Sequence, residues 1–373
     1  MTKAPTRILE LDGLRGLAIA LVLVWHYLIV PVDPSSSAFR AIVFQLGRWT
    51  WSGVDLFFVL SGFLITRILL THSESKNYYT TFYIRRCCRI FPLYYTFLAS
   101  FAVLTIIPIA NPAWLNYFIG DHCPLFTFAT FTHNICMAQN GGFRSNWIAI
   151  YWSLAIEEQF YLLLPLTIRV LSRRLVPVFF IGLLLSGVVL RSVSSPFASM
   201  VLFPWHCDSL AVGGLIAYFH TMHPQALNTL CSRVNMLAVF LVLTILLAIN
   251  PALLLTVESS WPGVYTWYAF LYGSLLVVLL NGHSRPLTRL LRLQGLRLLG
   301  ERSYAIYVMH QAVNGMIHFA VFEREPRLDS IAALSATACS LVATMLLAEI
   351  SWRVIERRAI SFGHSYQYES GHR

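Results

Sequence analysis

The sequence predicts an all-helical integral membrane protein, a bundle of about ten transmembrane helices with both termini in the cytoplasm. Hydrophobic residues make up 57% of the 373 residues and charged residues only 12%, with a mean hydropathy of +0.64. Because a soluble domain is about one quarter charged, this chain has too few charged groups to cover a water-exposed surface. The composition also argues against a nucleic-acid-binding protein, despite the net charge of +10.

Ten segments are long and apolar enough to cross a bilayer, which takes about 20 mostly apolar residues. They cover residues 11–30, 53–70, 91–109, 147–168, 175–190, 206–220, 235–255, 265–281, 303–322 and 331–350. The second, fourth, sixth and ninth are the least purely apolar, since they contain ionisable or small residues. The sequence therefore predicts a single transmembrane domain over residues 1–360 and a short cytoplasmic tail over residues 361–373.

The distribution of Lys and Arg predicts the orientation. With a cytoplasmic N-terminus, the cytoplasmic segments hold 21 of the 27 Lys and Arg residues, and the opposite side holds 6. Cytoplasmic loops of membrane proteins carry an excess of Lys and Arg. This distribution therefore favours an even number of spans with both ends inside.

The longest segment on the outer side covers residues 110–146, and its aromatic residues indicate that it folds back on the bundle. Cys123 and Cys136 share this segment and its oxidising side, so a disulfide and two free thiols are both open. His122 and His133 lie beside them, but the spacing matches no standard zinc pattern, and two surface histidines are the simpler interpretation. We therefore expect no metal site.

The first span carries three ionisable residues, which are costly in a bilayer and by default functional. A helix turns about 100° per residue, so Arg15 and His26 lie about 20° apart around it, and Asp12 shares their face. His26 lies roughly 16 Å deeper than Arg15. We interpret this face as one tunnel, with an anion-binding arginine at its cytoplasmic mouth and an imidazole within the bundle. The alternative is an Asp12–Arg15 pair and a His26 that bonds a neighbouring helix.

A basic cluster, Arg85, Arg86 and Arg89, precedes the third span. It is typical either of a topogenic or headgroup-anchoring segment or of a phosphate site, since guanidinium groups bond phosphates through paired N–H groups. In the second span, Ser61 and Gly62 are small and favour close helix packing, whereas the role of Asp55 is open.

Two adjacent carboxylates, Glu157 and Glu158, lie in the fourth span and point about 100° apart on a helix. They cannot serve the same partner, so we expect one to face a cation such as Arg15 or a catalytic histidine and the other to fix a neighbouring helix. Asp208 and His310 each occupy a later span, where a structural role in a buried network is favoured over direct chemistry.

Several segments, in their order along the chain, resemble the acyltransferase-3 family of membrane-bound acyltransferases. They are LDGLRGLAIALVLVWH, GVDLFFVLSGFLI, FYIRRCCRIFPLYY, WSLAIEEQFYLLLP, CDSLAVGGLIA, SYAIYVMH and SWRVIERR. The family pairs an Arg with a His eleven positions later, as in Arg15 and His26. Its FFxxSGxL element includes Ser61, and its RxxR motif matches Arg86 and Arg89.

This resemblance implies a multi-pass O-acyltransferase of the plasma (inner) membrane. Members of the family O-acetylate bacterial surface polysaccharides, nodulation oligosaccharides, peptidoglycan and some antibiotics. The implied reaction moves an acyl group, in most members acetyl, from acyl-CoA to a hydroxyl of a carbohydrate or glycan precursor. Acetyl-CoA is then a co-substrate, the lipid bilayer and the glycan are the partners, and no metal or nucleic acid takes part.

The implied donor site uses the basic cluster. Its candidate residues are Arg85, Arg86, Arg89 and Ser61, with the arginines bonding the CoA phosphates at the cytoplasmic rim.

The candidate catalytic residues are His26, Arg15, Glu157 and Asp12. His26 acts as general base on the acceptor hydroxyl, and an acyl-imidazole on His26 is the covalent variant. Glu157, or Asp12 as second choice, orients or charges the imidazole. Arg15 binds a CoA phosphate or stabilises the oxyanion, and its depth favours the phosphate.

Other functions remain open on the sequence alone. Arg, His and carboxylates within spans also mark proton-coupled transporters and flippases, although no paired repeat halves with broken helices are evident. A non-catalytic accessory subunit of a glycan pathway is a third interpretation. The acceptor is also open, since a macrolide or a lipid headgroup offers a hydroxyl as a glycan does.

The orientation can be tested with reporter fusions along the chain. Because the arginine excess is cytoplasmic in the ten-span topology, fusions after Leu70 and Arg174 should report a cytoplasmic position. Fusions near Asn140 and Glu325 should report the opposite side. A cytoplasmic reporter at Asn140 would contradict the topology.

Overall fold

The computed structural model describes residues 8–107, 112–143, 145–233, 236–249, 261–282 and 284–369, and every element in this part of the chain is helical. The long helices are α1 (Leu9–Val24) with its continuation η1 (Trp25–Ile29), α3 (Gly53–Thr71), α4 (Tyr78–Ile106), α8 (Trp152–Val170), α9 (Val176–Ser192), α11 (Asp208–Met222), α13 (Met236–Ile249), α14 (Val264–Leu280), α16 (Gln294–Phe322) and α17 (Ile331–Ser351). The shorter ones are α2 (Ala38–Gly47), η2 (Arg48–Ser52), α5 (Pro112–Phe118), α6 (Leu125–Ala129), α7 (His133–Asn140), η3 (Ala149–Tyr151), α10 (Pro196–Val201), α12 (Pro224–Arg233), α15 (Arg285–Leu291), η4 (Trp352–Glu356) and α18 (Arg357–Ser365).

Each of the ten predicted segments falls on one of the long helices. Parts of two, residues 108–109 of the third and residues 235 and 250–255 of the seventh, lie outside the described residues. By length and composition, four continuous helical stretches of the described chain can cross a membrane, or five if α14 and α15 form one bent span. The other predicted segments are helical but shorter or more polar. The protein therefore has several candidate spans, arranged as a helical bundle.

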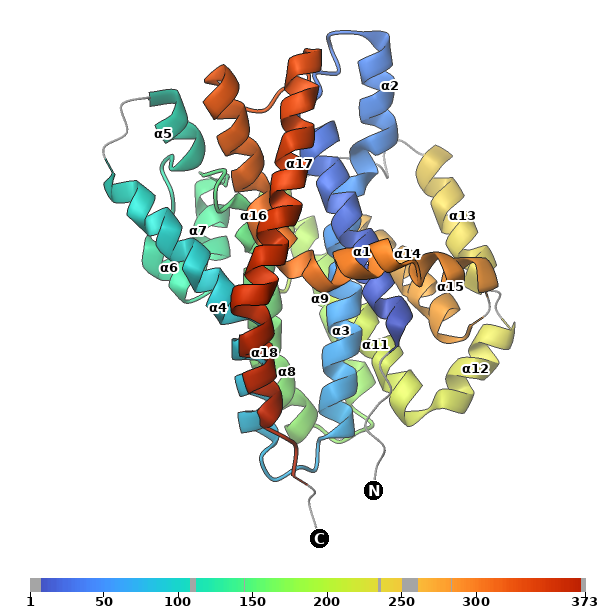
Figure 1. Cartoon of the computed structure of the whole chain (residues 1–373). Coiled ribbons are helices and arrows are strands. Elements are labelled where there is room, and N and C mark those ends of the chain that lie inside the picture. Colours follow the sequence, from blue (N-terminus) through green and yellow to red (C-terminus); the bar gives the residue numbers. More distant parts are fainter. Residues whose placement is uncertain are drawn as a thin grey trace.

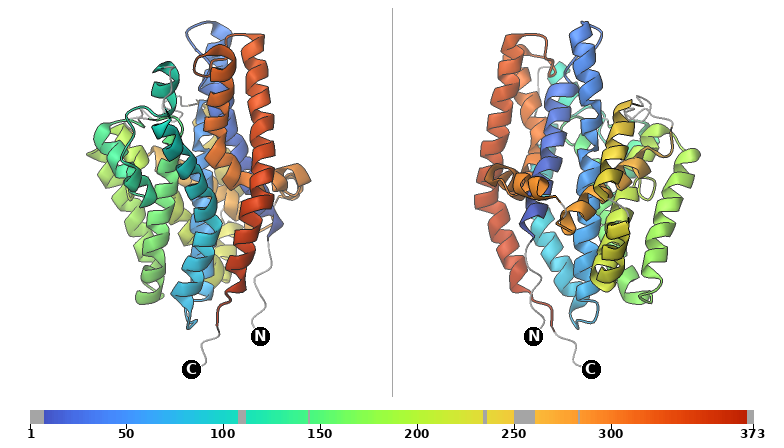
Figure 2. Two further views of the ribbon diagram at one scale, coloured as in Figure 1. Left: turned by 60° about the vertical axis from the view of Figure 1, so that its left-hand side comes forward. Right: turned by 90° about the vertical axis from the view of Figure 1, so that its right-hand side faces the viewer.

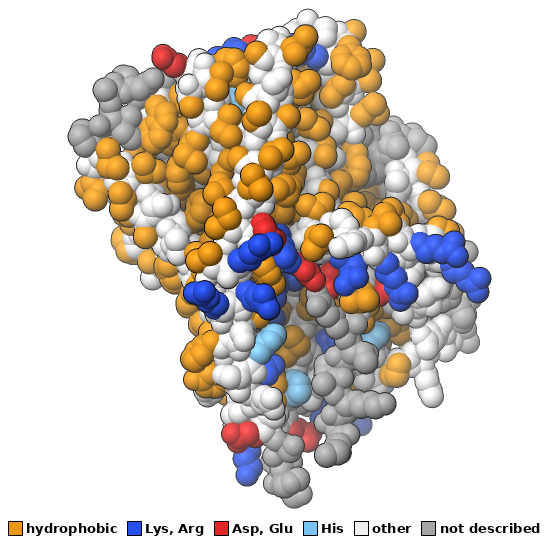
Figure 3. All heavy atoms as spheres, in the orientation of Figure 1, with side chains coloured by type: hydrophobic (Ala, Val, Ile, Leu, Met, Phe, Trp, Pro, Cys, Tyr) orange, Lys and Arg blue, Asp and Glu red, His pale blue; other side chains and the backbone are white. Residues whose placement is uncertain are grey.

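The helices run side by side along one direction, with α15 lying across them (Figures 1 and 2). The start of α1 and the end of α18 lie toward the same end of the bundle, and α2 and α5 lie toward the other (Figure 1). On the face drawn in Figure 3, hydrophobic side chains cover the upper part, and charged side chains gather in a band across α15 and the lower part of the α17–α18 helix. Such a band is typical of the cytoplasmic edge of a membrane region.

Two close helix crossings organise the centre of the bundle. Between α1 and α16, a Cβ on Gly16 would overlap the carbonyl oxygen of Leu296, and a Cβ on Gly300 would overlap that of Asp12. Between α3 and α11, Gly62 lies equally close to the backbone of Leu210. Small residues let helices approach until their backbones touch, so the packing role predicted for Gly62 is confirmed.

Two helices extend beyond the predicted segments. Helix α4 begins at Tyr78, before the span predicted from residue 91, so the basic cluster lies within the helix. Helix α18, which continues from α17 through η4 and packs against α4, crosses residue 360, where the sequence predicts the start of a tail. Polar turns extend both helices beyond their apolar stretches, and hydropathy detects only the apolar part.

The described part of the outer segment folds back on the bundle, as predicted. Phe118 of α5 is buried, with its ring 5.5 Å from that of Phe319 on α16. Cys123 and Cys136 form a disulfide, so neither thiolate is free to bind zinc. His133 is buried against Phe128 rather than exposed at the surface. No cluster of metal-ligating side chains occurs among the described residues.

Candidate active site

An inner cavity of about 320 Å³ lies among α1, α3, α4, α8 and α16. Val, Leu, Ile and Phe side chains line nearly half of it. The polar and aromatic residues in its wall include Arg15, Ser61, Arg86, Arg89, Ser153, Glu157, Tyr161, Ser303, Tyr304, Tyr307 and His364. Five of the predicted site residues, from four different helices, therefore meet in one place.

Three arginines of this cavity form no ion pair and no hydrogen bond within the described part of the chain: Arg15, Arg86 and Arg89. The guanidinium of Arg86 lies over the ring of Tyr161, 5.5 Å from its centroid. Glu157 is the one acidic residue among those that line the cavity, and its Oε1 accepts a hydrogen bond of 2.6 Å from Ser61. The cavity wall is therefore net positive and has guanidinium N–H groups available for an anion.

Helical register separates the arginines of α4. Arg86 and Arg89 are three residues apart, so they share a face and line the inner cavity. Arg85 points about 100° away from Arg86. Its Nε donates to the carbonyl oxygen of Tyr366 at 2.8 Å, and its guanidinium lies 5.2 Å from the ring centroid of Tyr368. This corrects the expectation for Arg85, which holds the C-terminal segment and does not line the cavity.

An outer cavity of about 530 Å³ lies at the opposite end of the bundle. His26 lines it, together with polar side chains that include Asp33, Arg40, Asn146, Gln311, Asn314, Glu325, Arg327 and Asp329. Hydrogen bonds from Ser35 hold the pKa of Asp33 below its usual value, and those from Arg324 do the same for Asp329. Both carboxylates therefore remain ionised acceptors at neutral pH.

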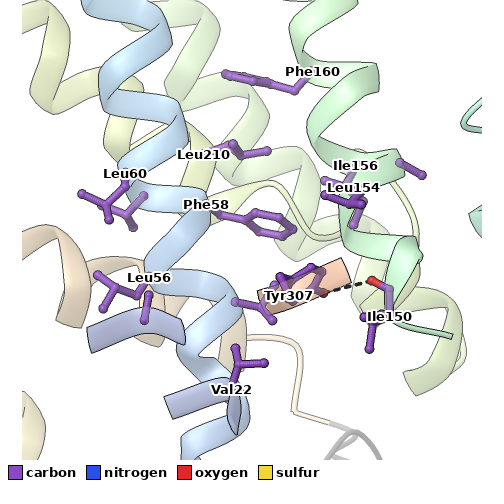
Figure 4. Packing of buried hydrophobic residues seen from close by; sticks show 14 of the residues in the cluster. Val22, Leu56, Phe58, Leu60, Ile150, Leu154, Ile156, Phe160, Leu210 and Tyr307 are labelled. Atoms are coloured by element: carbon purple, nitrogen blue, oxygen red, sulfur yellow. Dashed lines mark hydrogen bonds between the residues drawn. The ribbon is translucent and has the colours of Figure 1, made fainter. Parts of the chain in front are cut away.

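The two cavities share no lining residue, and a thin layer of side chains separates them. Tyr307 lines the inner cavity, and its ring centroid lies 5.8 Å from that of His310. The His310 ring lies 4.8 Å from the ring of His26 in the outer cavity. Tyr307 is fixed by a 2.9 Å hydrogen bond to the carbonyl oxygen of Ile150 (Figure 4). The structure thus has two cavities in line where the sequence predicts one tunnel.

The ring of His26 contacts no carboxylate in the described part of the chain. Its Nδ1 lies 3.1 Å from the carbonyl oxygen of Val22 and 3.2 Å from Nε2 of His310. Glu157 lies in the inner cavity, beyond Tyr307. Asp12 lines neither cavity and interacts electrostatically with Arg15. This corrects the expectation that either carboxylate orients the imidazole.

Glu157 and Glu158 face different surroundings, as the helical register predicts. Glu158 lines a smaller cavity with Cys87 and Gln159, next to Arg86, whereas Glu157 lines the inner cavity. The inner cavity therefore contains only one of the two adjacent carboxylates.

Asp55 and Asp208 belong to fully buried structural networks. Asp55 accepts hydrogen bonds from Ser209 and from the ring of His206. Asp208 forms an ion pair of 2.6 Å with Arg191. These contacts agree with the structural role favoured for Asp208, and neither aspartate lines the inner or the outer cavity.

The contact of His310 with His26 and the π-helical turn η1 that contains His26 were not predicted from the sequence. π-helical turns in α-helices occur frequently at functional sites. The spacing of Tyr304, Tyr307 and His310, three residues apart in each case, was the available signal. It places all three on one face of α16, where they extend from the inner cavity toward His26.

The chain is similar to known acyltransferases over most of its length. A family model described as an acyltransferase domain matches residues 8–352. The chain is 26% identical to the peptidoglycan O-acetyltransferase OatA of Listeria monocytogenes serovar 1/2a, over 93% of this chain and 55% of that protein. It is 27% identical to the O-acetyltransferase OatA of Staphylococcus aureus strain NCTC 8325, over 95% of this chain and 57% of that protein.

The chain thus spans a little over half the length of these two relatives. No solved structure matches the chain. The family match covers nearly all of the described helices and includes every residue of the inner cavity except His364. The chain therefore belongs to the acyltransferase-3 family.

Proposed function

We propose that the protein is a membrane-bound O-acyltransferase that moves an acetyl group from acetyl-CoA to a hydroxyl of a glycan. On this proposal it lies in the plasma membrane with about ten spans and both ends in the cytoplasm. The observation that carries the proposal is the pair of cavities in line, one with three unpaired arginines and the other with His26.

The inner cavity suits the donor. Acetyl-CoA carries its charge on phosphates at one end and its thioester at the end of a long, thin arm. Arg15, Arg86 and Arg89 supply unpaired guanidinium groups for the phosphates, and the apolar wall accommodates the arm. Glu157 and Ser61 then position the arginines rather than the imidazole. The thioester would reach the layer formed by Tyr307.

The outer cavity suits the acceptor. Amide and carboxylate side chains such as Asn146, Gln311 and Asp33 line it, and such groups bond sugar hydroxyls. One acceptor hydroxyl would donate to His26, which takes its proton as the oxygen attacks the thioester carbon. The new C–O bond forms, the C–S bond breaks, and the proton passes from His26 to the departing CoA thiolate.

The relatives and the family membership bear on the acceptor and on the class of protein. The relatives named above are O-acetyltransferases, one of them named for peptidoglycan, which favours a glycan over a macrolide or a lipid headgroup. Two cavities separated by a thin layer also suit a transporter, but membership of the acyltransferase-3 family favours group transfer.

The donor site can be tested by replacing Arg86 and Arg89 together with Gln. Each charged hydrogen bond lost should cost about 1.5–3 kcal/mol, so losing one bond from each arginine should weaken acetyl-CoA binding by at least about 100-fold. The measurement is binding of acetyl-CoA to the purified protein in detergent. Arg173 and Arg174, also on the cytoplasmic side in the proposed topology but lining neither cavity, provide the matched control as a double Gln variant. Unchanged binding in the Arg86 and Arg89 variant would place the donor elsewhere.

The role of His26 can be tested with His26→Gln. The variant should insert and bind acetyl-CoA, yet lose acyl transfer by at least about 100-fold, because an amide cannot accept the proton. Activity of the unmodified protein should fall as the pH falls and the imidazole becomes protonated. His318→Gln is the control, since His318 is a helical histidine that bonds Thr337 and lines neither cavity. Near-normal turnover of His26→Gln would rule out the assignment.

A further inference from the structure

We propose that His310 is a positioning residue that holds His26 in the one tautomer with an unprotonated Nε2 facing the outer cavity. The inference rests on the proposed role of His26 as general base. His310 then orients the imidazole of His26, which no carboxylate in the described part of the chain contacts.

The proton on His310 is fixed by backbone carbonyl groups. Its Nδ1 lies 2.7 Å from the carbonyl oxygen of Tyr307 and 3.2 Å from that of Ile306. A carbonyl oxygen only accepts hydrogen bonds, so Nδ1 of His310 must carry a proton. The ring is fully buried and contacts no carboxylate in the described part of the chain, which favours its neutral form. Its Nε2 is then an acceptor.

The proton on His26 follows from this assignment. Its Nδ1 has two neighbours, Nε2 of His310 at 3.2 Å and the carbonyl oxygen of Val22 at 3.1 Å. Both neighbours are acceptors, so Nδ1 of His26 carries the proton, and Nε2 of a neutral ring carries the lone pair. His26 lines the outer cavity, and its Nε2 has no hydrogen-bond partner in the described part of the chain. The lone pair is therefore available to an acceptor hydroxyl.

His310 is itself held in place from two other helices. The Tyr27 hydroxyl donates to the carbonyl oxygen of His310 at 2.9 Å. Because that hydroxyl proton is used, the 2.8 Å bond between Tyr27 and Thr344 has Thr344 as its donor. The position of His310 thus depends on η1 and α17 as well as on α16. Because His310 is held in place, its contact with His26 also restricts the orientation of the His26 ring.

His310 cannot act as the base in this arrangement. Both of its ring nitrogens are used, Nδ1 by Tyr307 and Nε2 by His26. Its side chain lines neither the inner nor the outer cavity, so it touches neither donor nor acceptor. His310 therefore affects the reaction only through its contact with His26.

Two substitutions separate positioning from chemistry. In His310→Gln the amide oxygen can still accept from His26 and the amide nitrogen can still donate to Tyr307, whereas in His310→Leu neither bond forms. The kcat of the Leu variant, measured as thiol release from acetyl-CoA with peptidoglycan glycan strands as acceptor, should fall by about 10–100-fold. The KM for acetyl-CoA should stay within about twofold, because the inner cavity is untouched, and Gln should restore most of the kcat.

A spectroscopic measurement makes the test independent of any acceptor. In the ¹⁵N NMR spectrum of protein labelled in its histidine rings, the His26 signals are those that disappear in His26→Gln. They should report a proton on Nδ1 in the unmodified protein and in His310→Gln. In His310→Leu only the Val22 carbonyl, 3.1 Å away, still accepts from Nδ1, so the preference for this tautomer should weaken and a mixture of tautomers should appear. Detergent-solubilised full-length protein with unchanged acetyl-CoA binding ensures that each variant is folded.

The outcomes are distinct. An unchanged His26 tautomer in His310→Leu would overturn the inference, because the Val22 carbonyl would then fix the tautomer by itself. A Gln variant as inactive as the Leu variant while its tautomer is intact would also overturn it. Full activity of His26→Gln with the expected tautomer change in His310→Leu would instead refute the proposed function and leave the contact between the two rings established.

Discussion

The close approach of α1 and α16 is the contact on which both cavities depend. Gly16 and Gly300 allow the two backbones to touch, and any larger residue at either position would overlap a carbonyl oxygen of the partner helix. Helices that cross this tightly present their facing side chains at fixed heights. One end of the contact places Arg15 in the inner cavity, and farther along the pair His26 meets His310.

The structural and the candidate functional arginines differ in how their charge is compensated. A charged side chain within a membrane protein is tolerated when it is paired or lines a polar cavity. Arg191 is paired, since it donates to both carboxylate oxygens of Asp208 and to Thr266. Arg15 and Arg89 instead line the inner cavity and form no ion pair among the described residues. An anionic ligand would complete their environment, as Asp208 completes that of Arg191.

Much of this arrangement is predictable from the sequence, because it depends on local periodicity. Apolar runs place the helices, and the i,i+3 spacing of Arg86 and Arg89 puts both on one face. What could not be predicted is the contact between His26 and His310, since 284 residues separate them and no local pattern reports the pairing. The role of Arg85 was equally hidden, because its partner Tyr366 lies at the far end of the chain.

The central claim is that donor and acceptor enter from opposite sides and meet at the layer formed by Tyr307, His310 and His26. The most direct test reconstitutes the protein in sealed vesicles of one known orientation, with acetyl-CoA on one side and peptidoglycan glycan strands on the other. Acetylated glycan should form only when acetyl-CoA is on the side of the inner cavity and the glycan on the side of the outer cavity. Product formed with both substrates confined to the inner-cavity side would contradict the account.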